Sequence, residues 1–313
     1  MTTHFLRDDD LTPDAQRAVL ELAQQLKSGA VAPRPLEGRA VAVIFDKAST
    51  RTRVSFSVGV HELGGYPLVL DSATTQSGRG ESVEDTVRVL DRHVAAIVWR
   101  TYAQAGLERA AAVSAVPVVN ALTDEFHPCQ VLADLQTVAE HCGGLAAEGP
   151  ALAGRSLAYL GDGANNMAHS YLLGGVTAGL DVRIGAPADY APDPAVVDRA
   201  HAIASRTGGS VLVTTDAREA VDGVTAVATD TWVSMGQEQE AGDRESPFVP
   251  YRVDEDLMAR GNDAVFLHCL PVYRGLEATA EVVDGDRSVI WDEAENRRHA
   301  QKAVLLHLLG GLT

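Results

Sequence analysis

A cluster of hydroxyl and guanidinium side chains occupies residues 49–53, which read Ser-Thr-Arg-Thr-Arg. Ser49 or Thr50 can cap a helix that starts here, because their side-chain oxygens accept from first-turn N–H groups. Those N–H groups have no intrahelical partner, and the helix dipole places partial positive charge among them. Arg51 and Arg53 add two guanidinium groups, so the segment predicts an anion site that suits a phosphate. The alternative interpretation, an ordinary solvated helix start, is favoured for a single basic residue but not for this cluster.

Three later segments also combine side chains that could do chemistry. They are 127–130 (His-Pro-Cys-Gln), 230–236 (Asp-Thr-Trp-Val-Ser-Met-Gly) and 268–271 (His-Cys-Leu-Pro). The first two could be plain turns, and Cys269 could be a small buried hydrophobic residue. Alternatively, an imidazole beside an amide can bind a polar carbonyl group, and an acid four residues before a hydroxyl suits the charged end of an α-amino acid.

The elements that must position these segments alternate between strands and helices. Apolar runs predict strands at 41–45, 66–70, 95–99, 116–120, 156–160, 181–185, 210–214, 224–228, 264–267 and 289–291. Periodic segments predict helices near 13–28, 50–63, 82–93, 103–113, 129–142, 165–178, 194–206, 216–221 and 293–309. This alternation predicts an α/β protein with two doubly wound parallel sheets, each covered on both faces. Such sheets bind ligands at the carboxyl ends of their strands, where all the polar segments lie.

Composition limits the class of protein. A chain of 313 residues with 46% apolar residues is long enough for two domains, and its longest apolar runs are too short to span a membrane. Its N-terminus does not resemble a signal peptide, and three dispersed cysteines predict no disulfide framework, so we expect a cytoplasmic protein. The formal net charge of −17 argues against nucleic acid as a partner. An anionic substrate would therefore need a local cluster of arginines.

The four polar segments together resemble the aspartate/ornithine carbamoyltransferase family. Residues 49–53 look like its phosphate-binding motif, and the three later segments match the pattern of its ornithine members, in order and at similar separations. Asn165 and Asn166, after a Gly-Asp-Gly turn, fit as well. The resemblance covers the chain from about residue 40 to the end, although segment 143–154 looks long for the family.

The resemblance implies a carbamoyl phosphate site. The phosphate would be bound by Ser49, Thr50, Arg51, Thr52, Gln76 and Arg297. The carbonyl oxygen, on which negative charge develops in a tetrahedral intermediate, would be bound by Thr52, Arg100 and His127. The carbamoyl NH₂ would donate to Gln130 and to the Leu270 carbonyl.

The acceptor implied by the resemblance is L-ornithine. Its amino-acid end would be bound by Asn166, Asp230, Ser234 and Met235, with Asp230 and Cys269 orienting the attacking amine. The products would be citrulline and phosphate, formed by direct attack and without a cofactor. The Ser-Met-Gly of 234–236 separates the ornithine members from the aspartate relatives. Two alternatives stay open: another amine acceptor such as aspartate, putrescine or N-acetylornithine, and a non-catalytic phosphate-binding protein.

Two cofactor sites are disfavoured. His127, Cys129, His141 and Cys142 lie close together in sequence, but their spacing is wrong for zinc and a predicted helix separates the two pairs. Residues 161–166 resemble a dinucleotide loop but carry Asn166 where a third glycine is required. We therefore expect neither a metal nor a nucleotide cofactor.

The resemblance also implies the arrangement of the chain. A carbamoyl-phosphate domain would contain residues 1–143 plus about 293–313, and an ornithine domain 150–292. The active site would lie in the cleft between them, and the C-terminal helix would cross back to the first domain. We expect a homotrimer, alone or as stacked trimers, in which the loop 71–82 brings Gln76 to the neighbouring site. The same site serves both arginine biosynthesis and arginine breakdown.

Overall fold

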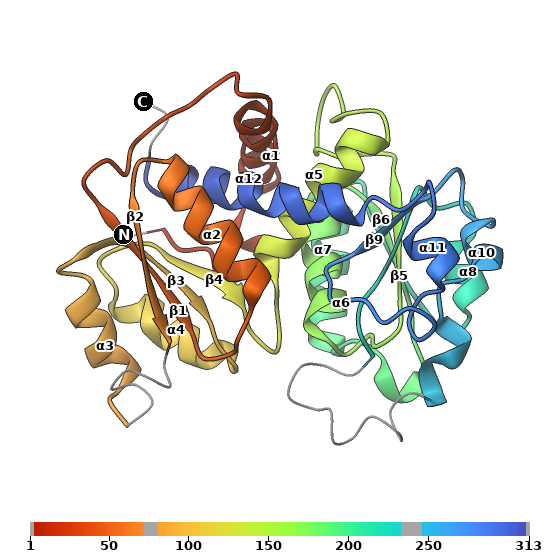
Figure 1. Cartoon of the computed structure of the whole chain (residues 1–313). Helices are drawn as coiled ribbons and strands as arrows, with labels where there is room; N and C mark the ends of the chain where they lie inside the picture. The colour runs from red at the N-terminus through yellow and green to blue at the C-terminus, as the bar shows by residue number, and fades with distance from the viewer. Residues whose placement is uncertain (1–2, 72–79, 233–245, 311–313) are drawn as a thin grey trace. The chain divides into compact units, whose positions relative to one another are not determined.

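The computed structural model describes residues 3–71, 80–232 and 246–310. The chain divides into two compact units, the first made of Met1–Ala133 and Glu295–Thr313 and the second of Asp134–Ala294. Each unit has its own parallel sheet (Figure 1). In the described part of the chain, no helix combines the length and apolar character needed to cross a membrane.

The sheet of the first unit has the strand order β2-β1-β3-β4. Its strands are β1 (Ala40–Phe45), β2 (Tyr66–Asp71), β3 (Val94–Arg100) and β4 (Val118–Leu122). All three neighbouring pairs are parallel, and Phe45 at the end of β1 lies opposite Arg100 at the end of β3. Outside the named strands, Phe5 forms a parallel bridge with Val119 and extends this sheet beyond β4.

Helices cover both faces of this sheet (Figure 1). They are α1 (Pro13–Ser28), α2 (Thr50–Glu62), α3 (Val83–Leu90) and α4 (Gln104–Val113). Ala42 and Ile44 of β1 share a buried apolar cluster with residues of α3 and α4. Because side chains alternate along a strand, Val41 and Val43 point to the opposite face, and α2 packs on β1 and β2. As predicted, helices cover both faces of this sheet, and its strands β1, β3 and β4 are buried.

The second unit repeats this architecture with the strand order β7-β6-β5-β8-β9. Its strands are β5 (Ser156–Leu160), β6 (Asp181–Gly185), β7 (Ser210–Thr214), β8 (Ala226–Thr229) and β9 (Val265–His268). Its helices include α6 (Asn166–Ser170), a π-helical turn (Tyr171–Gly175), α7 (Pro194–Thr207), α8 (Ala217–Val221), α10 (Glu255–Met258) and α11 (Ala280–Val283). The predicted fold class, two doubly wound α/β domains, is confirmed.

Two helices contribute residues to both units. The first is α5 (Pro128–His141), and the second is α12 (Ile290–Leu308), whose residues from Glu295 onward belong to the first unit. The expected return of the C-terminal helix to the first domain is therefore confirmed.

The expected strand at 289–291 is wrong. In that region Ser288 forms an isolated bridge with Phe266, and α12 begins at Ile290. Asp292 and Glu293 stand in the first turn of α12, where carboxylates interact favourably with the helix dipole. The short apolar run thus leads into a helix rather than forming a strand, with Val289 and Ile290 buried and Trp291 exposed.

Each sheet reverses its strand order once, between β1 and β3 in the first unit and between β5 and β8 in the second. At such a switch point the loops that follow the two neighbouring strands run to opposite faces of the sheet. A crevice therefore opens outside the carboxyl ends of these strands. The predicted site segments follow these strands: 49–53 after β1, Arg100 at the end of β3, 161–166 after β5, and Asp230 after β8.

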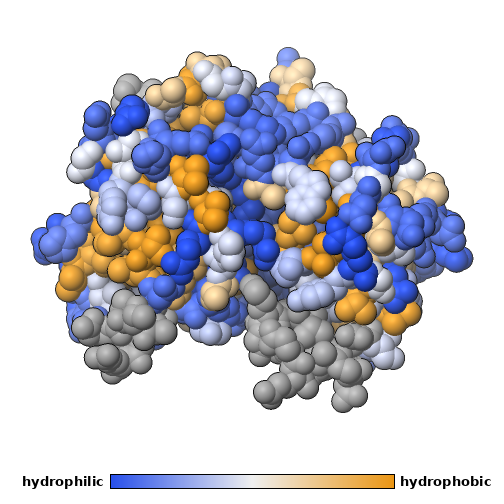
Figure 2. Space-filling view, in the orientation of Figure 1, coloured by the Kyte–Doolittle hydropathy of each residue, from blue (hydrophilic) through white to orange (hydrophobic). Residues whose placement is uncertain are grey.

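The surface of the first unit is apolar on the side of its edge strand. Figure 2 shows hydrophobic residues reaching the surface over this part of the sheet. Strand β2 is only half-buried along most of its length, and Val54, Tyr66 and Val89 are 55%, 66% and 57% exposed. An exposed apolar area of this kind is typical of a protein–protein contact.

Candidate active site

The start of α2 forms the first part of the candidate site. Ser49 is the N-cap of this helix, and its Oγ accepts a hydrogen bond from the Thr52 backbone N–H at 3.3 Å. The same hydroxyl donates to Thr52 Oγ1 at 3.1 Å. The expected cap is thereby confirmed, and the thirteen-residue helix directs its first-turn N–H groups toward the carboxyl end of the sheet.

A buried arginine joins three helices at this point. Arg297 of α12 donates from Nη1 to Gln130 Oε1 of α5 at 2.6 Å, and from Nη2 to Thr52 Oγ1 of α2 at 2.8 Å. Only 3% of Arg297 is exposed, and Gln130 and Thr52 are fully buried. Three residues predicted for carbamoyl phosphate, far apart in the sequence, are thus in direct contact.

His127 lies in the field of three guanidinium groups. Burial of its side chain, followed by the charges of Arg297, Arg100 and Arg51, holds the pKa of His127 well below its usual value. The imidazole is therefore neutral near pH 7, and a neutral ring carries one N–H donor. Arg100 is also buried, with 5% of its surface exposed.

Arg53 takes a different direction. Its Nη2 contacts Asp71 Oδ1 at 2.6 Å, and its guanidinium lies 4.9 Å from the centre of the Phe45 ring. The simple expectation that both arginines of 49–53 face one anion is corrected, because Arg53 is paired with a carboxylate at the end of β2. Arg51 is the arginine of this segment that acts on His127.

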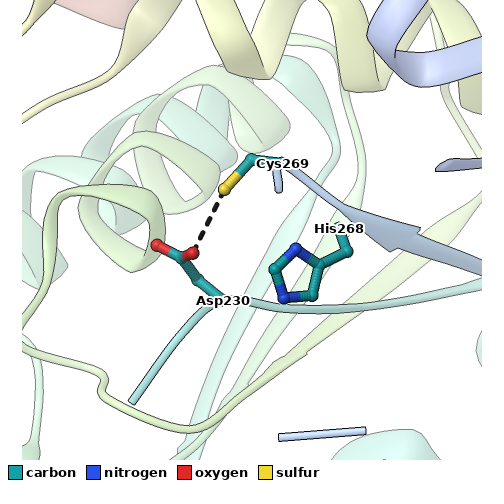
Figure 3. Close-up of side chains that lie close together, drawn as sticks. All are labelled: Asp230, His268 and Cys269. Atoms are coloured by element: carbon teal, nitrogen blue, oxygen red, sulfur yellow. Dashed lines mark hydrogen bonds between the residues drawn. The ribbon is translucent and has the colours of Figure 1, made fainter. Parts of the chain in front are cut away.

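A second group of polar side chains lies in the second unit. The Cys269 thiol donates to Asp230 Oδ1 at 3.2 Å, as Figure 3 shows. Burial and the nearby carboxylates, Asp230 first, raise the pKa of Cys269 well above its usual value, so the sulfur stays protonated. Asp230 is also fixed by the Thr231 backbone N–H, which donates to Oδ1 at 2.7 Å.

His268 fixes the backbone beside this cysteine. Its Nδ1 accepts from the Leu270 N–H at 2.9 Å, so the proton of a neutral ring lies on Nε2, which faces Glu277 Oε1 at 3.2 Å. The His268 backbone N–H donates to Glu293 Oε2 at 2.7 Å. Leu270, whose carbonyl is a predicted ligand, is held with a left-handed φ of 62°.

Asn166 is the first residue of α6, in the turn after β5. The preceding Asn165 caps the helix, accepting from the Ala168 N–H at 2.9 Å, and its amide donates to Tyr159 Oη at 2.7 Å. Gly161 begins the turn with φ of 128°, a conformation that suits glycine. Three further predicted site residues, Gln76, Ser234 and Met235, lie outside the described residues.

Both halves of the chain match profiles of one family. Residues 3–140 match the family description "Aspartate/ornithine carbamoyltransferase, carbamoyl-P binding domain", and residues 153–308 match "Aspartate/ornithine carbamoyltransferase, Asp/Orn binding domain". The chain belongs to the aspartate/ornithine carbamoyltransferase family. The resemblance inferred from the sequence motifs is therefore confirmed.

Similar proteins in this family are named ornithine carbamoyltransferases. One from Clavibacter sepedonicus is 60% identical over 311 residues, covering 99% of each chain. The structure of the Pyrococcus furiosus enzyme is 42% identical with a TM-score of 0.92, covering 100% of this chain and 98% of that one. An N-acetyl-L-ornithine transcarbamylase variant is 32% identical with a TM-score of 0.84, covering 98% and 99%. The more identical relatives thus favour the ornithine branch of the carbamoyltransferase family.

One group of possible metal ligands occurs in the described part of this carbamoyltransferase-family chain: Asp230, His268 and Cys269, whose ligand atoms lie within 4.8 Å of one another. Both ring nitrogens of His268 already face hydrogen-bonding partners. Asp230 Oδ1 accepts from the Cys269 thiol and from a backbone N–H. A cation would have to displace these hydrogen bonds, so the donor set fits a hydrogen-bonded amine site better than a metal centre.

The sequence analysis missed several residues that support the site. Glu277 and Glu293 bind the side chain and backbone of His268, and Tyr159 binds Asn165. None of them belongs to a local motif, because each pairs with a residue on another element. The sequence carries no signal for the burial of Glu277, whose side chain is 1% exposed.

The low pKa of His127 predicts an acid-sensitive contribution to stability. Below about pH 6.5 the unfolded imidazole gains a proton that the folded one does not, so stability falls as the pH falls. We expect the free energy of unfolding of His127→Asn to decline less than that of the wild type between pH 7 and 5. Urea unfolding at each pH measures this. His299, whose pKa burial lowers to about 4, is present in both proteins and cancels in the comparison.

The exposed His201 of α7 supplies the matched control. His201→Asn should follow the wild-type curve. If His127→Asn and His201→Asn lose stability in parallel with the wild type, the neutral state assigned to His127 is incorrect.

Proposed function

We propose that the protein transfers the carbamoyl group of carbamoyl phosphate to the δ-amine of L-ornithine, giving citrulline and phosphate. The observation that carries the proposal is the buried contact of Arg297 with Thr52 and Gln130, beside the neutral His127. Thr52, Gln130 and His127 lie in the part of the chain that matches the carbamoyl-P binding domain, and Arg297 belongs to the same compact unit.

In the proposed complex, guanidinium, hydroxyl and amide groups bind the phosphate. These are Ser49, Thr50, Arg51, Thr52, Arg297 and Gln76. Thr52, Arg100 and His127 donate to the carbonyl oxygen, where negative charge grows as the tetrahedral intermediate forms. Gln130, whose Oε1 accepts from Arg297, is the proposed acceptor for the carbamoyl NH₂. The Leu270 carbonyl is the second acceptor for that group.

The acceptor half of the reaction needs a neutral amine. A free lysine-like amine has a pKa of roughly 10.4, and removal from water favours its neutral form. Its lone pair attacks the carbamoyl carbon, and the bond from carbon to the phosphate oxygen breaks. Phosphate leaves with that electron pair and takes up the proton that the attacking nitrogen loses. Asp230 and Cys269 orient the amine, and Asn166, Ser234 and Met235 bind the amino-acid end. Because the amine attacks directly, Cys269 forms no acyl intermediate.

We propose the same domain limits as the sequence suggested: 1–143 plus about 293–313 for carbamoyl phosphate, and 150–292 for ornithine. The two profile matches, 3–140 and 153–308, support a division near this point. Since the donor is bound by one domain and the acceptor by the other, the reaction requires both. We further propose a cytoplasmic enzyme of arginine metabolism, which fractionation of cells expressing the chain would check.

The function is tested by an assay for citrulline and related products with carbamoyl phosphate and a panel of amines. Ornithine should react, whereas putrescine and N-acetylornithine should react at least about 10⁴-fold more slowly. The reason is that a site built to hydrogen-bond the free α-amino-acid end rejects analogues that lack it. Turnover of putrescine on a par with ornithine would overturn the proposed acceptor, and no product with any amine would overturn the proposed reaction.

The anion site is tested by substituting two arginines in the first turn of α2, Arg51 and Arg53. Arg51→Ala should lose a charge-assisted contact worth about 1.5–3 kcal/mol, which is roughly 10- to 100-fold in the dissociation constant of carbamoyl phosphate. Arg53→Ala is the matched control, because Arg53 is engaged with Asp71. Its affinity should stay near that of the wild type. Calorimetric titration measures both, and equal losses in the two variants would contradict the assignment of Arg51.

We also propose a homotrimer, alone or stacked, in which Gln76 completes the site of a neighbouring chain. The apolar surface beside β2, directly before this segment, supports a contact between copies. Arg51→Ala and Gln76→Ala chains, each weakly active, should regain activity when unfolded together and reassembled. In a closed ring roughly a quarter of the sites would then have both groups. Mixed trimers no more active than their parents would exclude a shared site.

A further inference from the structure

A buried polar network lies beneath the loop that presents His127. Its centre is Gln104, the first residue of α4, which is only 7% exposed. The Gln104 backbone N–H donates to Glu125 Oε2 at 2.9 Å, and its Nε2 donates to the Leu6 carbonyl at 3.1 Å. Its Oε1 accepts from Thr123 Oγ1 at 2.9 Å and from Asn120 Nδ2 at 3.3 Å. One side chain thereby ties together α4, β4, the N-terminal segment and the loop after β4.

Thr123 transmits this restraint to the loop. Its side chain is completely buried, and its Oγ1 accepts from the Phe126 N–H at 3.1 Å. Its backbone N–H donates to the Phe126 carbonyl at 2.8 Å. Both backbone polar groups of the residue before His127 are therefore held by one threonine. On the other side, the His127 carbonyl accepts from the Gln130 N–H at 3.0 Å and is fixed to the start of α5.

We propose that Gln104 and Thr123 are positioning residues for catalysis: they hold the imidazole of His127 where it donates to the carbonyl oxygen of the substrate. This inference rests on the proposed function, since it assumes that His127 contacts the carbamoyl group. The network, rather than the apolar packing around it, supplies the precision, because hydrogen bonds are directional and hydrophobic contacts are not. A misplacement of about 1 Å can cost roughly 100-fold in rate.

Two substitutions at Thr123 distinguish the effect of its hydroxyl group from the effect of its side-chain shape. Thr123→Val keeps the shape but leaves the Phe126 N–H and Gln104 Oε1 without this partner, and we expect kcat to fall about 10- to 100-fold. Thr123→Ser keeps the hydroxyl and should restore kcat to within about threefold of the wild type. The KM for ornithine should change little in both, because an interaction made in the transition state affects kcat.

A double-mutant cycle then distinguishes positioning from general stability. If Thr123 acts through His127, Thr123→Val should cause almost no further loss of kcat once His127→Ala is present, since the group that it positions is gone. Gln104→Met, which keeps the length of the side chain but removes its polar atoms, should behave in the same way. Coupling between Gln104→Met and Thr123→Val should also be strong, because they break the same hydrogen bond.

The matched control is a threonine of the second unit. Thr225 Oγ1 donates to the Ser156 carbonyl at 2.7 Å and accepts from the Ser156 N–H at 3.1 Å, joining β5 to the start of β8. Thr225→Val loses a similar number of hydrogen bonds away from the residues assigned to catalysis. It should lower the melting temperature while kcat stays near that of the wild type.

The outcomes separate this inference from the function on which it rests. A wild-type protein that forms no citrulline would refute the proposed function itself. An active wild type with an unchanged kcat in Thr123→Val would overturn the positioning role. The positioning role would also be overturned if the double mutant lost kcat by the product of the two single-mutant losses, because independent effects multiply.

Discussion

The buried guanidinium of Arg297 is the constraint on which the carbamoyl-phosphate half of the structure depends. Taking a charge out of water is costly, and this guanidinium donates to the Gln130 amide oxygen and to the Thr52 hydroxyl. Arg100 and Arg51 act on the same neutral His127. Positive charge concentrated in this way is best compensated by an anion. A chain with a formal net charge of −17 therefore attracts a phosphate through a local cluster rather than through its overall field.

The second unit has the opposite electrostatic character. Cys269 is kept as a thiol by burial and by the carboxylates around it, Asp230 first. Burial is the first cause of both pKa shifts, and the second cause differs in sign: carboxylates further raise the pKa of Cys269, and guanidinium groups further lower the pKa of His127. One unit favours an anionic ligand and the other a cationic one. This division sorts the two proposed substrates by charge, because carbamoyl phosphate is an anion and ornithine carries ammonium groups.

The sequence could predict where the chemistry would lie but not how the side chains pair. Motifs after strand ends located the sites, because parallel sheets bring the carboxyl ends of their strands together. Arg53 shows the limit: its position in the helix start favoured the anion, yet Asp71 at the end of the neighbouring strand binds it. The short apolar run at 289–291 had strand character, but the acidic residues after it make it a helix start. Tertiary pairing decided the first case, which no local pattern encodes, whereas the second depended on the residues that follow the apolar run.

The residues that escaped prediction share one physical property. All four are buried and polar: Gln104, Thr123, Glu277 and Glu293. Thr123 and Glu293 bind backbone N–H groups at or next to proposed site residues, those of Phe126 and His268. Gln104 and Glu277 act on side chains, since Gln104 accepts from Thr123 and Glu277 faces the His268 ring. Apolar packing can stabilise a loop without fixing the direction of a particular N–H or carbonyl, because the hydrophobic effect is non-directional. Burying a polar group stabilises the fold less than burying an apolar one, unless its hydrogen bonds are complete. The hydrogen bonds of Thr123 hold both backbone polar groups of Phe126, so they fix the residue next to His127 as the proposed positioning role requires. The carboxylates of Glu277 and Glu293 fix His268 in the same way, through its ring and its backbone N–H.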